Sequence, residues 1–128
     1  MLATLQADAG VGLLLGNPLR VVEAGAPKPA YPYLEIVRHE RAFRGGAGFE
    51  AGLHQIDLRT VSRDSGGMAA REAMAAVSEA LAVVFGPGPV DLGEWRCVLM
   101  TPVFGDFVQM RDGLWRALLR MKAIVEPA

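Results

Sequence analysis

The sequence predicts an α+β fold: a mainly antiparallel sheet of about five strands, one long helix (about 68–85) packed on it, and a short N-terminal helix. Three observations indicate this fold. Apolar and charged residues alternate along 115–126, which is typical of a strand although the residue types there favour a helix. Small apolar residues recur at helical spacing from Met68 to Phe85. Asp112 and Gly113 suit the two-residue type I′ turn that joins antiparallel strands.

The N-terminal part is predicted to hold the short helix and the first strand. The helix spans residues 2–15, and the sequence Gly-Asn-Pro at 16–18 ends it. Its expected buried face carries Leu2, Leu5, Ala9 and Leu13. A proline-rich connector then leads to the first strand, Tyr31 to His39, which is rich in aromatic and β-branched residues.

A glycine-rich stretch over residues 40–52 is expected to form a mobile loop between the first two strands. Phe43 and Phe49 bracket its glycines, and an isolated domain seldom exposes such large apolar groups on a loop. The second strand follows over residues 53–63, where Ile56, Leu58 and Thr60 alternate with Gln55, Asp57 and Arg59. We therefore expect a hairpin whose loop is a flexible connector or an arm that binds a partner.

The long helix and three further strands complete the predicted fold. The expected buried stripe of the helix comprises Ala70, Ala73, Met74, Val77, Ala80, Leu81 and Val84. Gly86 and Pro87 end this helix. The third strand begins at Trp95 and ends at Pro102, the fourth runs over 104–111, and the closing strand follows the Asp-Gly turn.

The composition favours one domain, residues 1–128, that assembles with other chains. Hydrophobic residues make up 52% of the sequence, which suggests that partner chains cover part of its apolar surface. Thirteen basic and fourteen acidic residues give a net charge of −1, so the basic footprint of a dedicated nucleic-acid-binding protein is missing. The apolar N-terminal residues lack the basic start of a signal peptide and are too short a run for a membrane anchor.

The sequence contains no catalytic constellation, so we expect neither an enzyme nor a cofactor. His39 and His54 are not spaced to place two metal ligands on one face, and each is expected to be an ordinary strand residue without a metal. Cys97, the only cysteine, alternates with apolar residues and is expected to point into the core. The glycine-rich loop lacks the lysine of a phosphate-binding loop.

The outer face of the last predicted strand is basic. Arg116, Arg120 and Lys122 share it, and they are candidates for contact with phosphates or with acidic partners. A second interpretation stays open, in which these charges only face solvent and discourage aggregation at the sheet surface.

Several segments together resemble one protein family. These are "YPYLEIV" after the proline-rich connector, "HQIDLRTVSRDSGGMAAREAMAAVSEAL", in which a strand runs into an Ala-rich helix, and "DG" before a long closing strand. In this order they resemble the tail-terminator or tail-completion proteins of long-tailed phages and of gene transfer agents. The resemblance covers nearly the whole chain, although no single motif in it is specific.

The resemblance implies a structural virion protein. Such proteins form a six-membered ring that caps the tail tube, stops its polymerisation and joins it to the head connector, while DNA passes through the ring without sequence-specific binding. The implied partners are further copies of the chain, the tail tube protein and the connector or stopper protein. The implied location is the head–tail interface of a virion assembled in the bacterial cytoplasm. The residues expected at subunit or partner interfaces are Arg41, Phe43, Arg44, Phe49 and Glu50. The resemblance also makes Arg116, Arg120 and Lys122 candidates for contact with DNA in the channel or with a partner ring.

Two functions of other classes remain open from the residues alone. One is a dimeric α+β domain that binds a small ligand, or acts on it, at the sheet face without helices. The other is a nucleic-acid-binding module that uses the basic last strand, although no aromatic residues for base stacking are interleaved with its charges.

Overall fold

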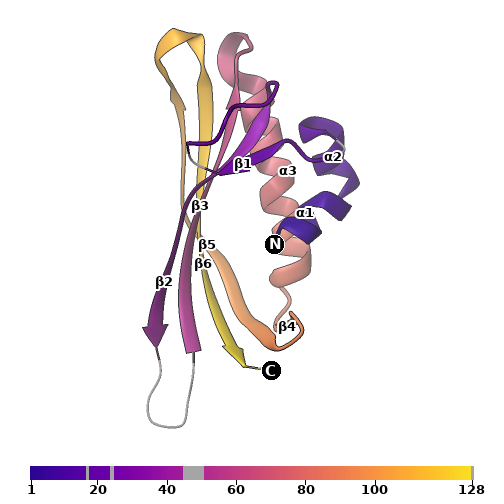
Figure 1. Ribbon diagram of the computed structural model, residues 1–128. Helices are drawn as coiled ribbons and strands as arrows, with labels where there is room; N and C mark the ends of the chain where they lie inside the picture. The colour runs from indigo at the N-terminus through magenta and orange to yellow at the C-terminus, as the bar shows by residue number, and fades with distance from the viewer. Residues whose placement is uncertain (17, 24, 45–50, 128) are drawn as a thin grey trace.

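The computed structural model describes residues 1–16, 18–23, 25–44 and 51–127. Within these residues, a curved six-stranded sheet carries all the helices on one face, in agreement with the predicted α+β class (Figure 1). The strand order is β1-β2-β3-β6-β5-β4. The strands are β1 (Val21–Glu23), β2 (Tyr33–Arg44), β3 (Ala51–Ser62), β4 (Val90–Asp91), β5 (Trp95–Gln109) and β6 (Trp115–Pro127). The α-helices are α1 (Leu2–Ala7), α2 (Ala9–Leu15) and α3 (Met68–Phe85).

The six strands correct the expected five. The predicted third and fourth strands form a single strand, β5, which shifts register between Cys97 and Leu99 and again between Pro102 and Phe104. Beyond Cys97, β5 pairs only with β6, and a proline is tolerated in such an edge strand. The additional strands β1 and β4 contain three and two residues. They are too short to give a periodic pattern in the sequence.

The closing strand confirms the prediction from alternation. In β6, Ala117, Leu119, Met121 and Ala123 are buried towards α3. Their neighbours in sequence lie on the opposite face of the sheet. Asp112 and Gly113 do turn the chain before β6, with φ angles of 65° and 73°, but they belong to a 3-10 turn over Arg111–Gly113. Because the Met110 N–H donates to the Leu114 carbonyl, the loop holds three residues and not the two of the predicted type I′ turn. Alternation therefore outweighs helix propensity here, because one face of the strand is buried and the other is not.

The hairpin of β2 and β3 is longer than expected. Strand β2 continues to Arg44 and β3 begins at Ala51, so residues 40–44 and 51–52 belong to strands and not to the predicted loop. The remaining loop residues, 45–50, lie outside the described residues. The end of this hairpin extends past the helices (Figure 1).

The N-terminal helix is broken into α1 and α2. Asp8 has an extended conformation between them, and its side chain accepts a hydrogen bond from the backbone N–H of Val11 at 2.9 Å. This cap starts a new helix and rotates the buried face. Consequently Leu13, which was expected to be buried, is 85% exposed, whereas Val11 and Leu15 are buried.

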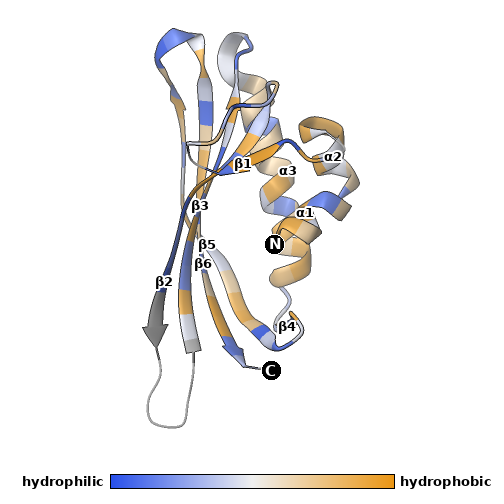
Figure 2. Ribbon diagram, in the orientation of Figure 1, coloured by the Kyte–Doolittle hydropathy of each residue, from blue (hydrophilic) through white to orange (hydrophobic). Residues whose placement is uncertain are grey.

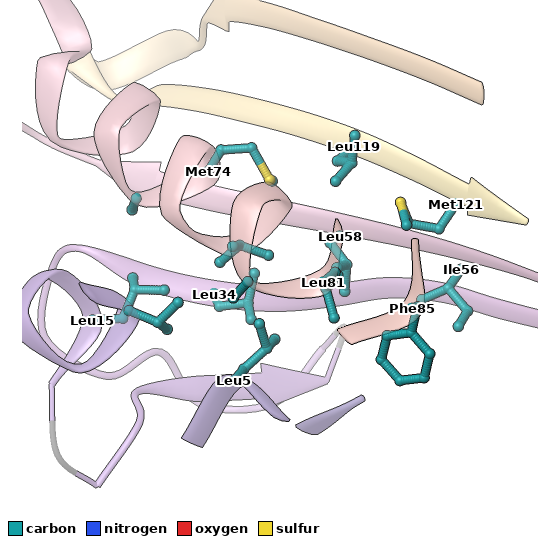
Figure 3. Packing of buried hydrophobic residues seen from close by; sticks show 14 of the residues in the cluster. Leu5, Leu15, Leu34, Ile56, Leu58, Met74, Leu81, Phe85, Leu119 and Met121 are labelled. Carbon is teal, nitrogen blue, oxygen red and sulfur yellow. The ribbon is translucent and has the colours of Figure 1, made fainter. Parts of the chain in front are cut away.

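Helix α3 has the bounds that the sequence predicts, and it forms the centre of the core. Figure 3 shows Met74, Leu81 and Phe85 of α3 between the sheet and the short N-terminal helices. One predicted core residue is wrong: Val84 is 39% exposed and Phe85 is buried in its place. Val84 lines a groove whose other wall includes Ala3, Thr4 and Ala7 of α1. Figure 2 shows hydrophobic and hydrophilic bands alternating along the strands.

Candidate functional site: the open face of the sheet

The sheet surface opposite α3 gathers most of the charged strand residues. We call it the open face. It is formed by Glu35, Arg38 and Glu40 of β2, Asp57 and Arg59 of β3, Arg116, Leu118, Arg120, Lys122 and Glu126 of β6, and Arg96, Leu99, Phe104, Asp106 and Val108 of β5. Strand alternation brings these residues to one face because their neighbours point into the core.

A bidentate ion pair lies at the centre of the open face. Arg120 donates from Nε to Asp57 Oδ1 at 3.0 Å and from Nη2 to Asp57 Oδ2 at 3.2 Å. The hydrogen bond to Asp57, and then the negative charge of Asp57, raise the pKa of Arg120. The guanidinium also lies over the ring of Phe104, at 5.7 Å from its centre. Arg120 is therefore largely neutralised by a neighbour on the adjacent strand.

A second ion-pair cluster surrounds Glu35. Its side chain is 1% exposed and pairs with Arg59 and with Lys28, whose Nζ lies 2.7 Å from Glu35 Oε2. Burial alone raises the pKa of Glu35, but the hydrogen bonds and positive charges of Lys28 and Arg59 outweigh it and lower that pKa below its usual value. The carboxylate thus stays charged although it is buried.

Further pairs balance the charges towards the edges of this face. Arg38 pairs with Glu40 at 2.6 Å, and Arg96 pairs with Glu126. In the described part of the chain, Arg116, Lys122 and Asp106 have no ion pair within 4.0 Å. The open face therefore combines matched charges with a few unmatched ones of both signs.

The predicted basic face of the last strand is confirmed in its geometry. Arg116, Arg120 and Lys122 lie on the open face, as their spacing requires. They do not act as one basic patch, because Asp57 neutralises Arg120 and, of the three, only Lys122 is exposed whereas the two arginines are half-buried. Sequence analysis placed Asp57 on the same kind of face but could not assign its partner, which depends on the pairing of β3 with β6.

The predicted interface residues of the hairpin fall in three groups. Arg41 is exposed and lies on the side of the sheet opposite the open face, with its guanidinium 5.8 Å from the ring centre of Trp95. Phe43 and Arg44 belong to the end of β2. Phe49 and Glu50 lie outside the described residues, so the structure does not test their predicted role.

Arg41 also borders a hollow that the sequence did not indicate. Its other lining residues are His54, Leu92, Trp95 and Val125, and its volume is about 340 Å³. Trp95 and Leu92 are 38% and 47% exposed. None of these described lining residues belongs to a helix.

His39 and His54 form a contact that sequence analysis missed. Nε2 of His39 and Nδ1 of His54 lie 2.8 Å apart, within hydrogen-bond distance. A register shift between Ile36 and Arg38 places His39 on the same face as His54. Simple alternation along β2 would place His39 on the open face instead. The sequence pattern therefore could not predict that His39 and His54 meet. Burial, and then the positive charges of His39 and Arg41, lower the pKa of His54.

The chemistry available in the described residues is limited. No group of three or more His, Cys, Asp or Glu side chains within them could hold a metal ion. Cys97 is 1% exposed, as predicted, and burial raises the pKa of its thiol. None of the described helices is long and apolar enough to cross a membrane.

Comparison with known proteins agrees with the resemblance seen in the sequence. A comparison with curated proteins gives no match. A chain of a solved structure described as "Virion of native gene transfer agent (GTA) particle" has the same fold, with a TM-score of 0.80 and 24% sequence identity over 97% of this chain and 90% of that one. The model of the family "Tail completion protein gp17" matches residues 1–126. Because this match spans nearly the whole sequence, the chain belongs to the family of tail completion proteins gp17.

Proposed function

We propose that this protein is a structural component of a phage-like tail and that it completes the tail at its head-proximal end. Six copies form a ring that caps the tail tube, stops its polymerisation and offers a docking surface to the head connector. The observation that carries this proposal is the family match over residues 1–126. The fold shared with a chain of a gene transfer agent virion supports the same setting. The particle is then assembled in the bacterial cytoplasm.

The charges of the open face suit a channel through which DNA slides. Each basic residue that contacts phosphate releases counterions and adds affinity, so a passage for DNA should carry few free cations. On this face Arg59, Arg96 and Arg120 are each paired with a carboxylate. We therefore place the open face towards the channel, with Arg116 and Lys122 as its unmatched basic groups.

The exposed apolar residues suit subunit contacts. Val83 on α3, Leu92 beside β4 and Val103 on β5 are 69%, 47% and 47% exposed. An isolated small protein gains little from such exposure, whereas a ring covers apolar surface between neighbouring copies. This supports assembly over the alternative of a ligand-binding domain, because the open face is filled by ion pairs.

The proposal is tested by mass and by imaging. The mass of the purified protein is measured by light scattering, alone and with preassembled tubes of the tail tube protein from the same particle. Negative-stain images then show whether tube ends carry a cap and whether tubes stop growing. A six-copy mass, or a cap at one end of growth-arrested tubes, supports the proposal. A monomer or dimer that leaves tube length unchanged at high concentration contradicts it.

A further inference from the structure

The sheet has two long edges that lack a partner strand in the described chain. Strand β5 pairs with β4 only at Arg96 and Cys97, so its outer edge from Leu99 to Gln109 is free. Strand β2 pairs with β1 only from Leu34 to Ile36, so its outer edge from 37 to 44 is free. Backbone N–H and C=O groups along such edges are a template for pairing with another chain.

The edge of β5 has little of the protection usual for an edge strand. It is long, and Leu99, Phe104 and Val108 are 48%, 49% and 40% exposed on its open face. Soluble proteins normally keep edge strands short or place lysines on them. Pro102 and the register shift beside it interrupt this edge, so the regular free stretch runs over residues 104–109. A partner strand along the start of this stretch also covers exposed Phe104.

The directions of the strands determine how two copies can join. β2 with β3, β3 with β6 and β6 with β5 are all antiparallel, so β2 and β5 run in opposite directions. Rotation about a ring axis keeps the direction of each strand relative to that axis. In a ring, β5 of one copy and β2 of the next are therefore antiparallel neighbours, and the contact repeats until the ring closes.

Charges near the two edges are complementary. Asp106 lies on the open face of β5, and its Oδ1 is shielded from solvent without a hydrogen-bond partner in the part of the chain that the structure describes. Arg38 lies on the open face at the start of the free edge of β2, is 47% exposed and pairs only with Glu40 of its own strand among the described residues. Pairing β5 with a second β5 instead puts the same acidic edge against itself.

From these observations we propose that β5 of one copy adds to the free edge of β2 of the neighbouring copy, with Asp106 facing Arg38 across the contact. The four long strands of each copy, β2, β3, β6 and β5, then join those of its neighbours in one continuous antiparallel sheet around the ring. This inference rests on the proposed ring and specifies how its subunits join. In the register that sets Asp106 opposite Arg38, residues 104–107 of β5 pair with residues 37–40 of β2, next to the part of β2 that β1 covers.

Charge reversal tests the contact. Asp106→Arg and Arg38→Asp each place like charges across the interface, so each variant alone is expected to need at least about tenfold more protein to assemble. The double variant restores the attraction with reversed sign. A mixture of the two single variants is also expected to assemble, because copies that alternate around an even-numbered ring present opposite charges at every contact. Light scattering measures assembly, with tube tips added if the protein assembles only there.

Controls separate folding and function from edge pairing. Glu72→Arg makes the same charge change at an exposed position in the first half of α3, which belongs to neither edge and is about three helical turns from Val83, and it is expected to assemble normally. Thermal unfolding shows whether each variant is folded.

Three outcomes would contradict the inference. If the wild-type protein caps tubes and both single variants assemble as well as the wild type, the edge pairing is wrong while the proposed function stands. If only Asp106→Arg is impaired, β5 pairs with β5 and the inference is wrong. If the wild-type protein neither assembles nor caps tubes, the proposed function fails and the inference with it.

Discussion

Glu35 is the residue at which burial and charge compete most directly. Its carboxylate is held by Lys28 and Arg59, so its removal leaves Arg59, which is 19% exposed, without its partner. Removing one partner of a buried ion pair is costly, because the remaining charged group has neither its partner nor hydrating water. We predict that Glu35→Gln lowers the free energy of unfolding by about 3 kcal/mol, measured by urea denaturation. Glu40→Gln, which breaks an exposed pair, should cost less than about 1 kcal/mol.

The lowered pKa of Glu35 adds a pH signature to this comparison. A carboxylate whose pKa is lower in the folded state stabilises the protein above the unfolded value of 4.5, and this stabilisation is lost as the pH falls through the folded value. The difference between the wild type and Glu35→Gln should therefore be full at about pH 7 and shrink at about pH 3. A difference that stays constant with pH contradicts the assigned ion pairs.

His54 gives a second pH dependence of the same sign, in a higher pH range. Burial and the charges of His39 and Arg41 lower its pKa, so between the folded value and the unfolded value of 6.5 the unfolded chain binds more protons. Stability is then complete above 6.5 and falls as the pH decreases. We predict that the wild type loses more free energy of unfolding than His54→Gln between about pH 7.5 and about pH 5. Parallel losses in both proteins count against this assignment.

At the scale of elements, the corner between β3 and α3 depends on two adjacent glycines. Gly66 and Gly67 have φ angles of 79° and 70°, which disfavour any other residue. An added Cβ at Gly67 comes within 2.7 Å of the stacked rings of Phe107 and Trp115, whereas an added Cβ at Gly66 has no heavy atom within 4 Å. Only Gly67 therefore packs against the end of the sheet.

The two alanine variants separate backbone strain from packing. Both Gly66→Ala and Gly67→Ala carry a backbone cost of about 1–2 kcal/mol. We predict that Gly67→Ala loses a further 1–3 kcal/mol, roughly, because it overpacks the corner. Urea denaturation of both variants measures the difference. Equal losses show that Phe107 and Trp115 move aside without cost.

How far the sequence predicts an element depends on whether local patterning or long-range pairing defines it. β6 and α3 are predicted well, because each buries one face continuously along its length. The N-terminal helix is predicted less well. The side chain of Asp8 caps a second helix there, so the helix is interrupted and Val11 is buried instead of Leu13. β5 is read as two strands because Pro102 resembles a strand end in sequence, whereas the pairing with β6 continues past it.

The features of the open face also divide into those that local patterning predicts and those that depend on long-range strand pairing. Alternation correctly placed Arg116, Arg120 and Lys122 on one face, since that depends only on the period of a strand. Neutralisation of Arg120 by Asp57 requires the register between two strands that lie far apart in the sequence. The histidine pair requires a register shift within β2. Neither register leaves a pattern in the sequence.

At the scale of the whole molecule, the two layers have different roles in the proposed assembly. The helical layer completes the core of each copy, and the sheet offers an open face to the channel and free edges to the neighbours. Continuous edge pairing places the open faces of all copies side by side. Any unpaired charge on that face is then repeated once per subunit. A substitution that changes one charge therefore changes the charge of the channel surface once for every copy in the ring.

This repetition gives a prediction for Asp57, which neutralises Arg120. Asp57→Asn keeps the shape of the side chain but frees one arginine charge per copy, so we predict that the assembled ring binds duplex DNA more tightly than the wild type. Each phosphate newly contacted should steepen the plot of log affinity against log salt by about 0.9, measured by fluorescence anisotropy of labelled DNA. Glu79→Gln removes the same charge from α3 and should leave this slope unchanged. If Asp57→Asn has the wild-type slope, Arg120 does not face the DNA, and the open face belongs on the outside of the ring.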